Sequence, residues 1–140
     1  MIKLRAHHLL CIPRFYGRGY NGQYEKSFEE ICRTIRENPE VKVQIVRGTD
    51  QICSRCPYEQ GDACNKRAGI NHWILFQDQK VLYKLGISVG DFFAAKDIFR
   101  LSIEKISPKD IEGICKGCEF LRDCLESGVN SSFIEDLNNY

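Results

Sequence analysis

The sequence predicts a mainly helical α+β fold: a single compact domain over residues 1–140, with a small sheet and Cys-rich metal-binding loops. Three observations lead to this prediction. A length of 140 residues suits one domain. Several segments repeat apolar residues at helical spacing, whereas only one segment alternates clearly as a strand does. Six of the eight cysteines fall into two short groups, which lie mostly in expected loops.

The first half of the chain contains one expected helix and one expected strand. The helix precedes Asn38-Pro39, which ends it, and Ser27 with Glu30 forms a capping box inside or at its start. Its apolar stripe consists of Tyr24, Phe28, Ile31, Cys32 and Ile35. We therefore interpret Cys32 as a core residue. Alternation over residues 41–45 predicts a half-buried strand.

The second half is expected to be loop first and helix afterwards. Residues 57–71 are predicted to be mostly loop, and residues 73–76 fit either a strand or a buried helix. Residues 80–85 predict a helix that Gly86 ends. A longer helix is expected over residues 91–106, with a core face formed by Phe92, Ala95, Ile98, Phe99, Ile103 and Ile106.

Three further segments follow this helix. Ser107-Pro108 predicts a helix start, and Gly113 is expected to break that helix before Cys115. Residues 120–127 predict another helix, which ends at Gly128. The tail from residue 130 onward is expected to fray.

Composition excludes several classes of protein. A hydrophobic fraction of 43% and a charged fraction of 28% are ordinary for a globular chain and exclude disordered or collagen-like sequences. No apolar run reaches the roughly 18 residues that a membrane span needs. The first residues lack the apolar core of a secretory signal. We therefore expect a cytoplasmic protein without a membrane partner.

The cysteines form two groups with the spacing of metal ligands. Cys53 and Cys56 are followed by Cys64, and Cys115 and Cys118 are followed by Cys124. A Cys-x-x-Cys turn presents two sulfurs on one side, and a nearby third thiol can close around the same ion or cluster. Redox-active dithiols and reduced core cysteines are the alternatives. Without a secretory signal, metal ligation is favoured over a disulfide framework.

A seventh cysteine has two histidines beside it. If the segment is helical, His7 and His8 lie four and three residues before Cys11, on neighbouring positions of the helix surface. An imidazole beside a thiol makes half of a metal site. The alternative is a short buried helix whose histidines bond to the backbone. Cys11, His7 and His8 are therefore candidate metal ligands, whereas His72 is expected to be structural.

Charge and glycine patterns give weaker indications of a partner. The net charge is +1, but residues 1–24 hold Lys3, Arg5, Arg14 and Arg18 with no acidic residue. This basic start could meet an anionic ligand or nucleic acid, and nucleic acid is not favoured because the chain is not basic overall. Residues 17–22 match GxGxxG, yet no strand precedes them, so we do not predict a dinucleotide site.

Several of these motifs together resemble a known family. They are the Arg-x-His-His-Leu-Leu-Cys start at residues 5–11, the Gly-x-Gly-Tyr turn at 17–20, the Asp50-to-Cys53 lead-in, Cys56-Pro57 and both cysteine groups. Over nearly its whole length, the chain resembles a family of small archaeal and bacterial proteins of unknown function, often described as iron–sulfur binding. The family commonly has Pro-Trp after the second Cys of the last group, where this chain has Glu119-Phe120.

Three functions fit these observations. The first is an iron–sulfur protein for electron transfer or sensing, with a redox partner. The second is a zinc-stabilised binding module whose basic N-terminal face meets an anionic partner. The third is an enzyme with an open metal or cluster position, in which His7 or His8 acts as the acid–base group. Cys56-Pro57 resembles the Cys-Pro of bacterial ferredoxins and mildly favours a cluster over zinc.

Overall fold

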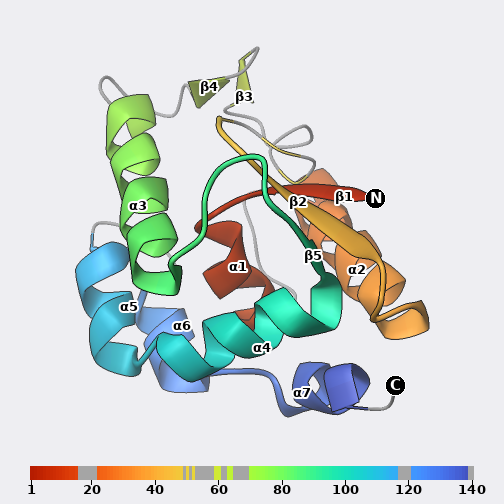
Figure 1. Ribbon diagram of the computed structural model, residues 1–140. Coiled ribbons are helices and arrows are strands. Elements are labelled where there is room, and N and C mark those ends of the chain that lie inside the picture. Colours follow the sequence, from red (N-terminus) through yellow and green to blue (C-terminus); the bar gives the residue numbers. More distant parts are fainter. Residues whose placement is uncertain are drawn as a thin grey trace.

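The sheet is built from three short strands far apart in the sequence (Figure 1). Strand β1 (Ile2–Arg5) pairs in parallel with β2 (Lys42–Val46), and β2 pairs in antiparallel fashion with β5 (Phe92–Ala94). In this register Ile2 lies opposite Val43 and Leu4 opposite Ile45. All four of these side chains are buried, so the register places one apolar face of the sheet in the core.

The structure, a computed structural model, describes residues 1–15, 22–48, 50, 52, 59–60, 63–64, 70–116 and 121–138. Its helices are α1 (His8–Cys11), the 3₁₀ helix η1 (Ile12–Arg14), α2 (Gly22–Glu37), α3 (Ile70–Leu85), α4 (Ala95–Lys105), α5 (Pro108–Ile114), α6 (Leu121–Ser127) and α7 (Ser131–Asn138). Strands β3 (Glu59–Gln60) and β4 (Ala63–Cys64) pair with each other in antiparallel fashion. The predicted mainly helical α+β fold with a small sheet is confirmed.

The short helix α1 lies in the middle of the molecule, below the sheet and against α4 (Figure 1). Leu9 and Leu10 are completely buried, which accounts for this central position. The Ser102 hydroxyl of α4 donates a hydrogen bond of 2.9 Å to the Leu9 carbonyl oxygen. Burial and this hydrogen bond fix the position of α1 and of the functional candidates at its two ends.

Most of the expected element boundaries agree with the structure. Strand β2 and the end of α2 are where the sequence predicts them. The Ser107 side chain caps α5 by accepting a hydrogen bond from the Asp110 amide, and the Asp110 carboxylate accepts one from the Ser107 amide. Gly86 and Gly128 follow α3 and α6 with φ values of 68° and 67°, a conformation that glycine adopts without strain.

The long helix predicted over residues 91–106 is wrong at its beginning. Phe92 to Ala94 form β5, and only Ala95–Lys105 are helical. The Phe92 side chain is 54% exposed rather than on a core face. Ile106 is buried, but it lies just beyond the helix. Pairing of residues 92–94 with β2 satisfies backbone groups across the sheet, and this long-range gain outweighs the local helical pattern.

Other expectations are also corrected. The tail does not fray: its residues 131–138 form α7, which packs on α2 and α4 through the buried Phe133 and Leu137. Ser27 and Glu30 lie inside α2, one of the two positions expected for them, so they do not cap its start. Helix α5 ends at Ile114, directly before Cys115 as predicted and one residue after Gly113. Helix α3 begins at residue 70 and includes both the ambiguous run 73–76 and the expected helix 80–85. Strand β1 was not predicted.

Among the helices of the described residues, none combines the length and the apolar character required to traverse a bilayer.

Candidate functional site

The first part of the site lies where β1 passes into α1. The strand ends at Arg5, and the chain turns through Ala6 and His7 into the helix. The amides of Leu10 and Cys11 both donate to the His7 carbonyl oxygen, at 3.0 and 3.3 Å. Residues 8–11 are helical, which was the condition for placing the histidines beside Cys11, but the histidines bond to carboxylates rather than to the backbone.

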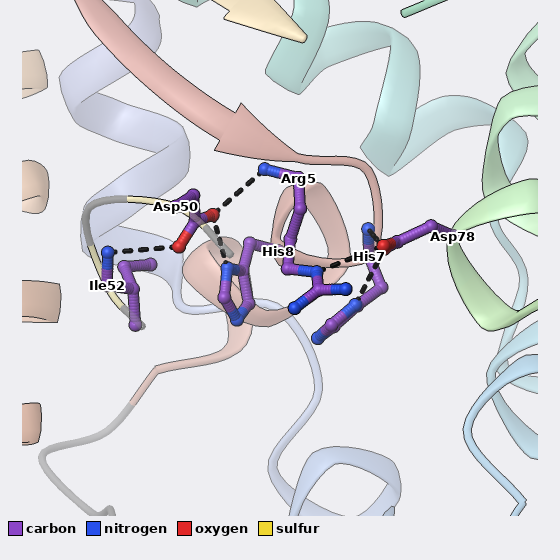
Figure 2. Close-up of polar contacts among 6 residues, drawn as sticks. All are labelled: Arg5, His7, His8, Asp50, Ile52 and Asp78. Atoms are coloured by element: carbon purple, nitrogen blue, oxygen red, sulfur yellow. Dashed lines mark hydrogen bonds and ion pairs between the residues drawn. The ribbon is translucent and has the colours of Figure 1, made fainter. Parts of the chain in front are cut away.

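Asp50 holds one of the two histidines. Its Oδ2 atom accepts hydrogen bonds from the Arg5 amide at 2.9 Å and from His8 Nδ1 at 2.6 Å (Figure 2). Its Oδ1 atom accepts a bond of 3.0 Å from the Ile52 amide, which closes a local turn. The Asp50 and His8 side chains are 0% and 4% exposed, so this pair is closed off from bulk water.

Asp78 of α3 holds the other histidine. Its Oδ1 atom accepts hydrogen bonds from both the amide and Nδ1 of His7, at 2.9 and 2.7 Å (Figure 2). Its Oδ2 atom accepts from Nε of Arg5 at 3.0 Å, in an ion pair whose side chains are 1% and 8% exposed. Three contacts to one carboxylate thus tie the start of α1 to α3. We call Arg5, His7, His8, Asp50 and Asp78 the histidine–carboxylate site.

Electrostatics assign the protonation of the His7–Asp78 pair. Burial lowers the pKa of His7, and the neighbouring charges of His8 and Arg5 act in the same direction against the opposing effect of Asp78. Burial alone would raise the pKa of Asp78, but the interactions with His7 and Arg5 bring it below its ordinary value. At neutral pH the carboxylate is therefore ionised and the imidazole is neutral. Its Nδ1 carries the proton that Asp78 accepts, which leaves a lone pair on Nε2.

Sequence reasoning missed both carboxylates of this site. Asp50 lies 42 residues from His8 and Asp78 lies 71 residues from His7. The available signal was weak: Asp50 stands in the lead-in to Cys53, and Asp78 follows the apolar run 73–76 within a polar stretch. Only the folded chain brings them to the histidines.

The second part of the site surrounds Arg14, at the end of η1. Arg14 is 6% exposed, and its Nη1 donates a hydrogen bond of 2.9 Å to the Leu10 carbonyl oxygen. Burial lowers the pKa of Arg14, and the nearby thiols of Cys11, Cys124 and Cys115 act in the opposite direction. We call these three cysteines the Arg14 thiol set.

The Arg14 thiol set joins the start of the chain to its last third. Cys11 ends α1, Cys115 caps the C-terminal end of α5, and Cys124 lies in α6. The Asn130 amide donates a hydrogen bond of 2.8 Å to the Pro13 carbonyl oxygen, so η1 is also anchored beside the α6–α7 connection. A buried guanidinium favours thiolates over thiols, and thiolates are the form that binds metals.

The structure describes only some of the other cysteines of the chain. Cys53, Cys56 and Cys118 lie outside the described residues, and only the backbone of Cys64, in β4, is described. Cys32 packs against the core from α2, as expected. Within the described part of the chain, no three Cys, His, Asp or Glu side chains already lie in an arrangement that could hold a metal ion.

The expected basic N-terminal surface is reduced by burial. Arg5 and Arg14 are both inside the protein, while Lys3 is exposed and Arg18 lies outside the described residues. Phe15 packs inward, stacked on Phe28 with ring centroids 4.7 Å apart. Residues 17–21 of the GxGxxG match are also outside the described residues, and Gly22 begins α2.

Comparison with known proteins decides the family. A family model described as "Protein of unknown function (DUF1284)" matches residues 19–124. The chain belongs to the DUF1284 family. The match includes Asp50, Asp78 and both cysteine groups, whereas it begins after His7, His8 and Cys11. No curated protein and no solved structure matches the chain.

Proposed function

We propose that this DUF1284 protein binds an iron–sulfur cluster through the thiolates of Cys11, Cys115, Cys118 and Cys124, and that it serves in electron transfer or sensing. The observation that supports this is that Cys11, Cys115 and Cys124, from three different helices or helix ends, all lie near enough to the buried Arg14 to raise its pKa against the effect of burial. Cys118 would be the fourth ligand, supplied by the Cys-x-x-Cys turn that begins at Cys115.

Arg14 has a specific role in this proposal. Four thiolates around a metal centre leave a net negative charge, and burying such a charge without a counter-charge is costly. The Arg14 guanidinium supplies one positive charge inside the protein. Charges and hydrogen bonds near the sulfurs are also among the factors that set the potential of such clusters.

Zinc is the alternative occupant of the same four ligands, because a tetrahedral Cys₄ set suits it equally. The Cys-x-x-Cys…Cys spacing of both groups and the family resemblance favour the cluster. Cys53, Cys56 and Cys64 form the second predicted ligand group, with Cys56-Pro57 as its ferredoxin-like feature.

Metal content measured after anaerobic purification tests the proposal. Iron, zinc and acid-labile sulfide are determined per chain, and a visible absorption spectrum is recorded. We expect iron with matching sulfide and a reducible brown chromophore. Zinc without sulfide would replace the cluster by the zinc alternative, and a metal-free protein would refute both.

Variants identify the ligands in the same assay. Cys115→Ser and Cys118→Ser should each lose the metal assigned to this site and its absorption. Cys32→Ser is the matched control, because Cys32 is a half-buried cysteine of α2 that packs on the core. Unchanged metal content in both ligand variants would contradict the assignment.

A further inference from the structure

The two histidines of the histidine–carboxylate site are arranged alike and lie beside each other. Each ring uses Nδ1 to contact a buried carboxylate, at 2.7 Å for His7 and 2.6 Å for His8. The ring centroids are 4.4 Å apart, with the planes tilted by 59°. In Figure 2 the Nδ1 edge of each ring faces its carboxylate, so Nε2 is the ring nitrogen on the other edge in both.

This arrangement is the one that metal-binding histidines adopt. A carboxylate that accepts the proton of Nδ1 fixes the tautomer, directs the ring and makes Nε2 a stronger donor of its lone pair. Two such pairs on adjacent residues place two oriented nitrogen ligands in one location. Asp78 directs the His7 ring in this way and Asp50 directs the His8 ring.

The charge of the site also suits a cation. Asp78 and Asp50 contribute two negative charges, because each accepts three hydrogen bonds as an ionised carboxylate does. Arg5 contributes one positive charge. The site therefore holds two carboxylates against one guanidinium, an excess of negative charge that a bound cation would offset.

We propose that Nε2 of His7 and Nε2 of His8 bind a divalent transition-metal ion, separate from the thiolate cluster. Imidazole nitrogens suit ions such as Zn²⁺, Co²⁺ and Ni²⁺. Asp78 and Asp50 orient the two ligands without touching the ion. The described residues supply two nitrogens and no complete ligand set, so water or a small anion takes further positions. An ion with such open positions can activate water or polarise a bound oxygen.

Cobalt(II) titration of the anaerobically purified full chain tests this site. Bound Co²⁺ gives visible d–d absorption, and thiolate ligation adds a strong near-ultraviolet charge-transfer band. We expect one Co²⁺ per chain that shows the visible bands without the thiolate band. Absence of any such ion would overturn the proposal.

Asparagine substitutions separate ligation from structure. In His7→Asn and His8→Asn, the amide nitrogen can still donate to Asp78 or Asp50, while Nε2 is removed. We expect each variant to remain folded and to lose the nitrogen-bound Co²⁺. His72→Asn is the matched control at the remaining histidine of the chain. Retention of Co²⁺ in both variants, or its loss in His72→Asn alone, would overturn the assignment.

Substitution of Asp78, which contacts His7 but not the proposed ion, tests its orienting role through the affinity for Co²⁺. Asp78→Asn should weaken Co²⁺ binding by about 10–100-fold without changing the stoichiometry, as outer partners of metal ligands typically do. Unchanged affinity in a folded Asp78→Asn protein would contradict the role of Asp78.

The Cys118→Ser variant tests the thiolate site separately from the imidazole site. In Cys118→Ser the thiolate-bound metal should be lost while the nitrogen-bound Co²⁺ remains. Loss of the nitrogen-bound ion in Cys118→Ser would show that the two sites are one, and would overturn the proposal of a separate site.

Discussion

Arg5 connects more of the site than any other single residue described. Its backbone amide binds Asp50 and its side chain binds Asp78, so it contacts both carboxylates that hold the histidines. The guanidinium is 1% exposed although it is charged. A buried charge is tolerated only when it is paired and hydrogen-bonded. The position of Arg5 therefore depends on Asp78, and Asp78 depends equally on Arg5.

Removing the Arg5 guanidinium should lower the stability of the folded protein. We expect Arg5→Met to lower the free energy of unfolding by about 3–5 kcal/mol, because it leaves the Asp78 carboxylate buried without its counter-charge. Urea unfolding followed by circular dichroism measures this change. Lys3→Met, on the same strand but exposed, is the control and should change stability by about 0.5 kcal/mol or less. Equal effects of the two substitutions would refute the pairing argument.

The His7–Asp78 pair predicts how stability depends on pH. Because the pKa of His7 in the folded protein lies below its ordinary value of 6.5, the unfolded chain takes up a proton that the folded protein excludes. Stability should therefore fall as pH drops below about 6.5, with a slope of at most about 1.4 kcal/mol per pH unit for this proton. Asp78, whose folded pKa is also lowered, adds a loss of the same sign at more acidic pH.

Unfolding measured between pH 7.5 and pH 5.5 in metal-free buffer checks this dependence. His7→Asn should show a shallower decline than the natural sequence, because it lacks the titrating group. An identical decline in both proteins would show that His7 does not contribute.

At the scale of elements, local patterns predicted most of the helices and few of the strands. Helix α5 carries its start signal in Ser107, Pro108 and Asp110, which act on adjacent backbone groups. Strands β1 and β5 carry no comparable signal, because each is stabilised by pairing with β2, dozens of residues away. The alternation that a strand needs was too short to recognise in either.

Helix α7 provides a test at this scale. Leu137 is 1% exposed and packs within the core, so Leu137→Ala should lower the free energy of unfolding by about 2–5 kcal/mol. Thermal or urea unfolding measures the difference. Ile134→Ala on the same helix, where the side chain is 37% exposed, should have a clearly smaller effect. A negligible effect at Leu137 would restore the expectation of a frayed tail.

At the scale of the whole molecule, the functional candidates join distant parts of the chain. The histidine–carboxylate site connects β1 and α1 to α3 and to the segment after β2. The Arg14 thiol set connects the end of α1 to α5 and α6. A metal centre at that set would therefore link the beginning of the chain to its last third.

Removal of the proposed thiolate-bound metal should consequently affect the entire fold. A structural metal site contributes roughly 10–16 kcal/mol of apparent binding free energy, whereas a whole domain is stabilised by about 5–15 kcal/mol. We expect the chelated protein to unfold partly or completely, which calorimetry and far-ultraviolet circular dichroism would detect. An unchanged unfolding transition after complete metal removal would show that the metal does not stabilise the fold.

The sequence by itself determined the fold class, the helices with strong end signals and the grouping of cysteines, because these depend on spacing within a few residues. It also singled out His7, His8 and Cys11. Only the tertiary structure decided that the two histidines bind Asp78 and Asp50, and that Cys11, Cys115 and Cys124 all lie near Arg14. These contacts join residues 42 to more than 100 positions apart. Burial and charge pairing select such partners, and neither leaves a local pattern in the sequence.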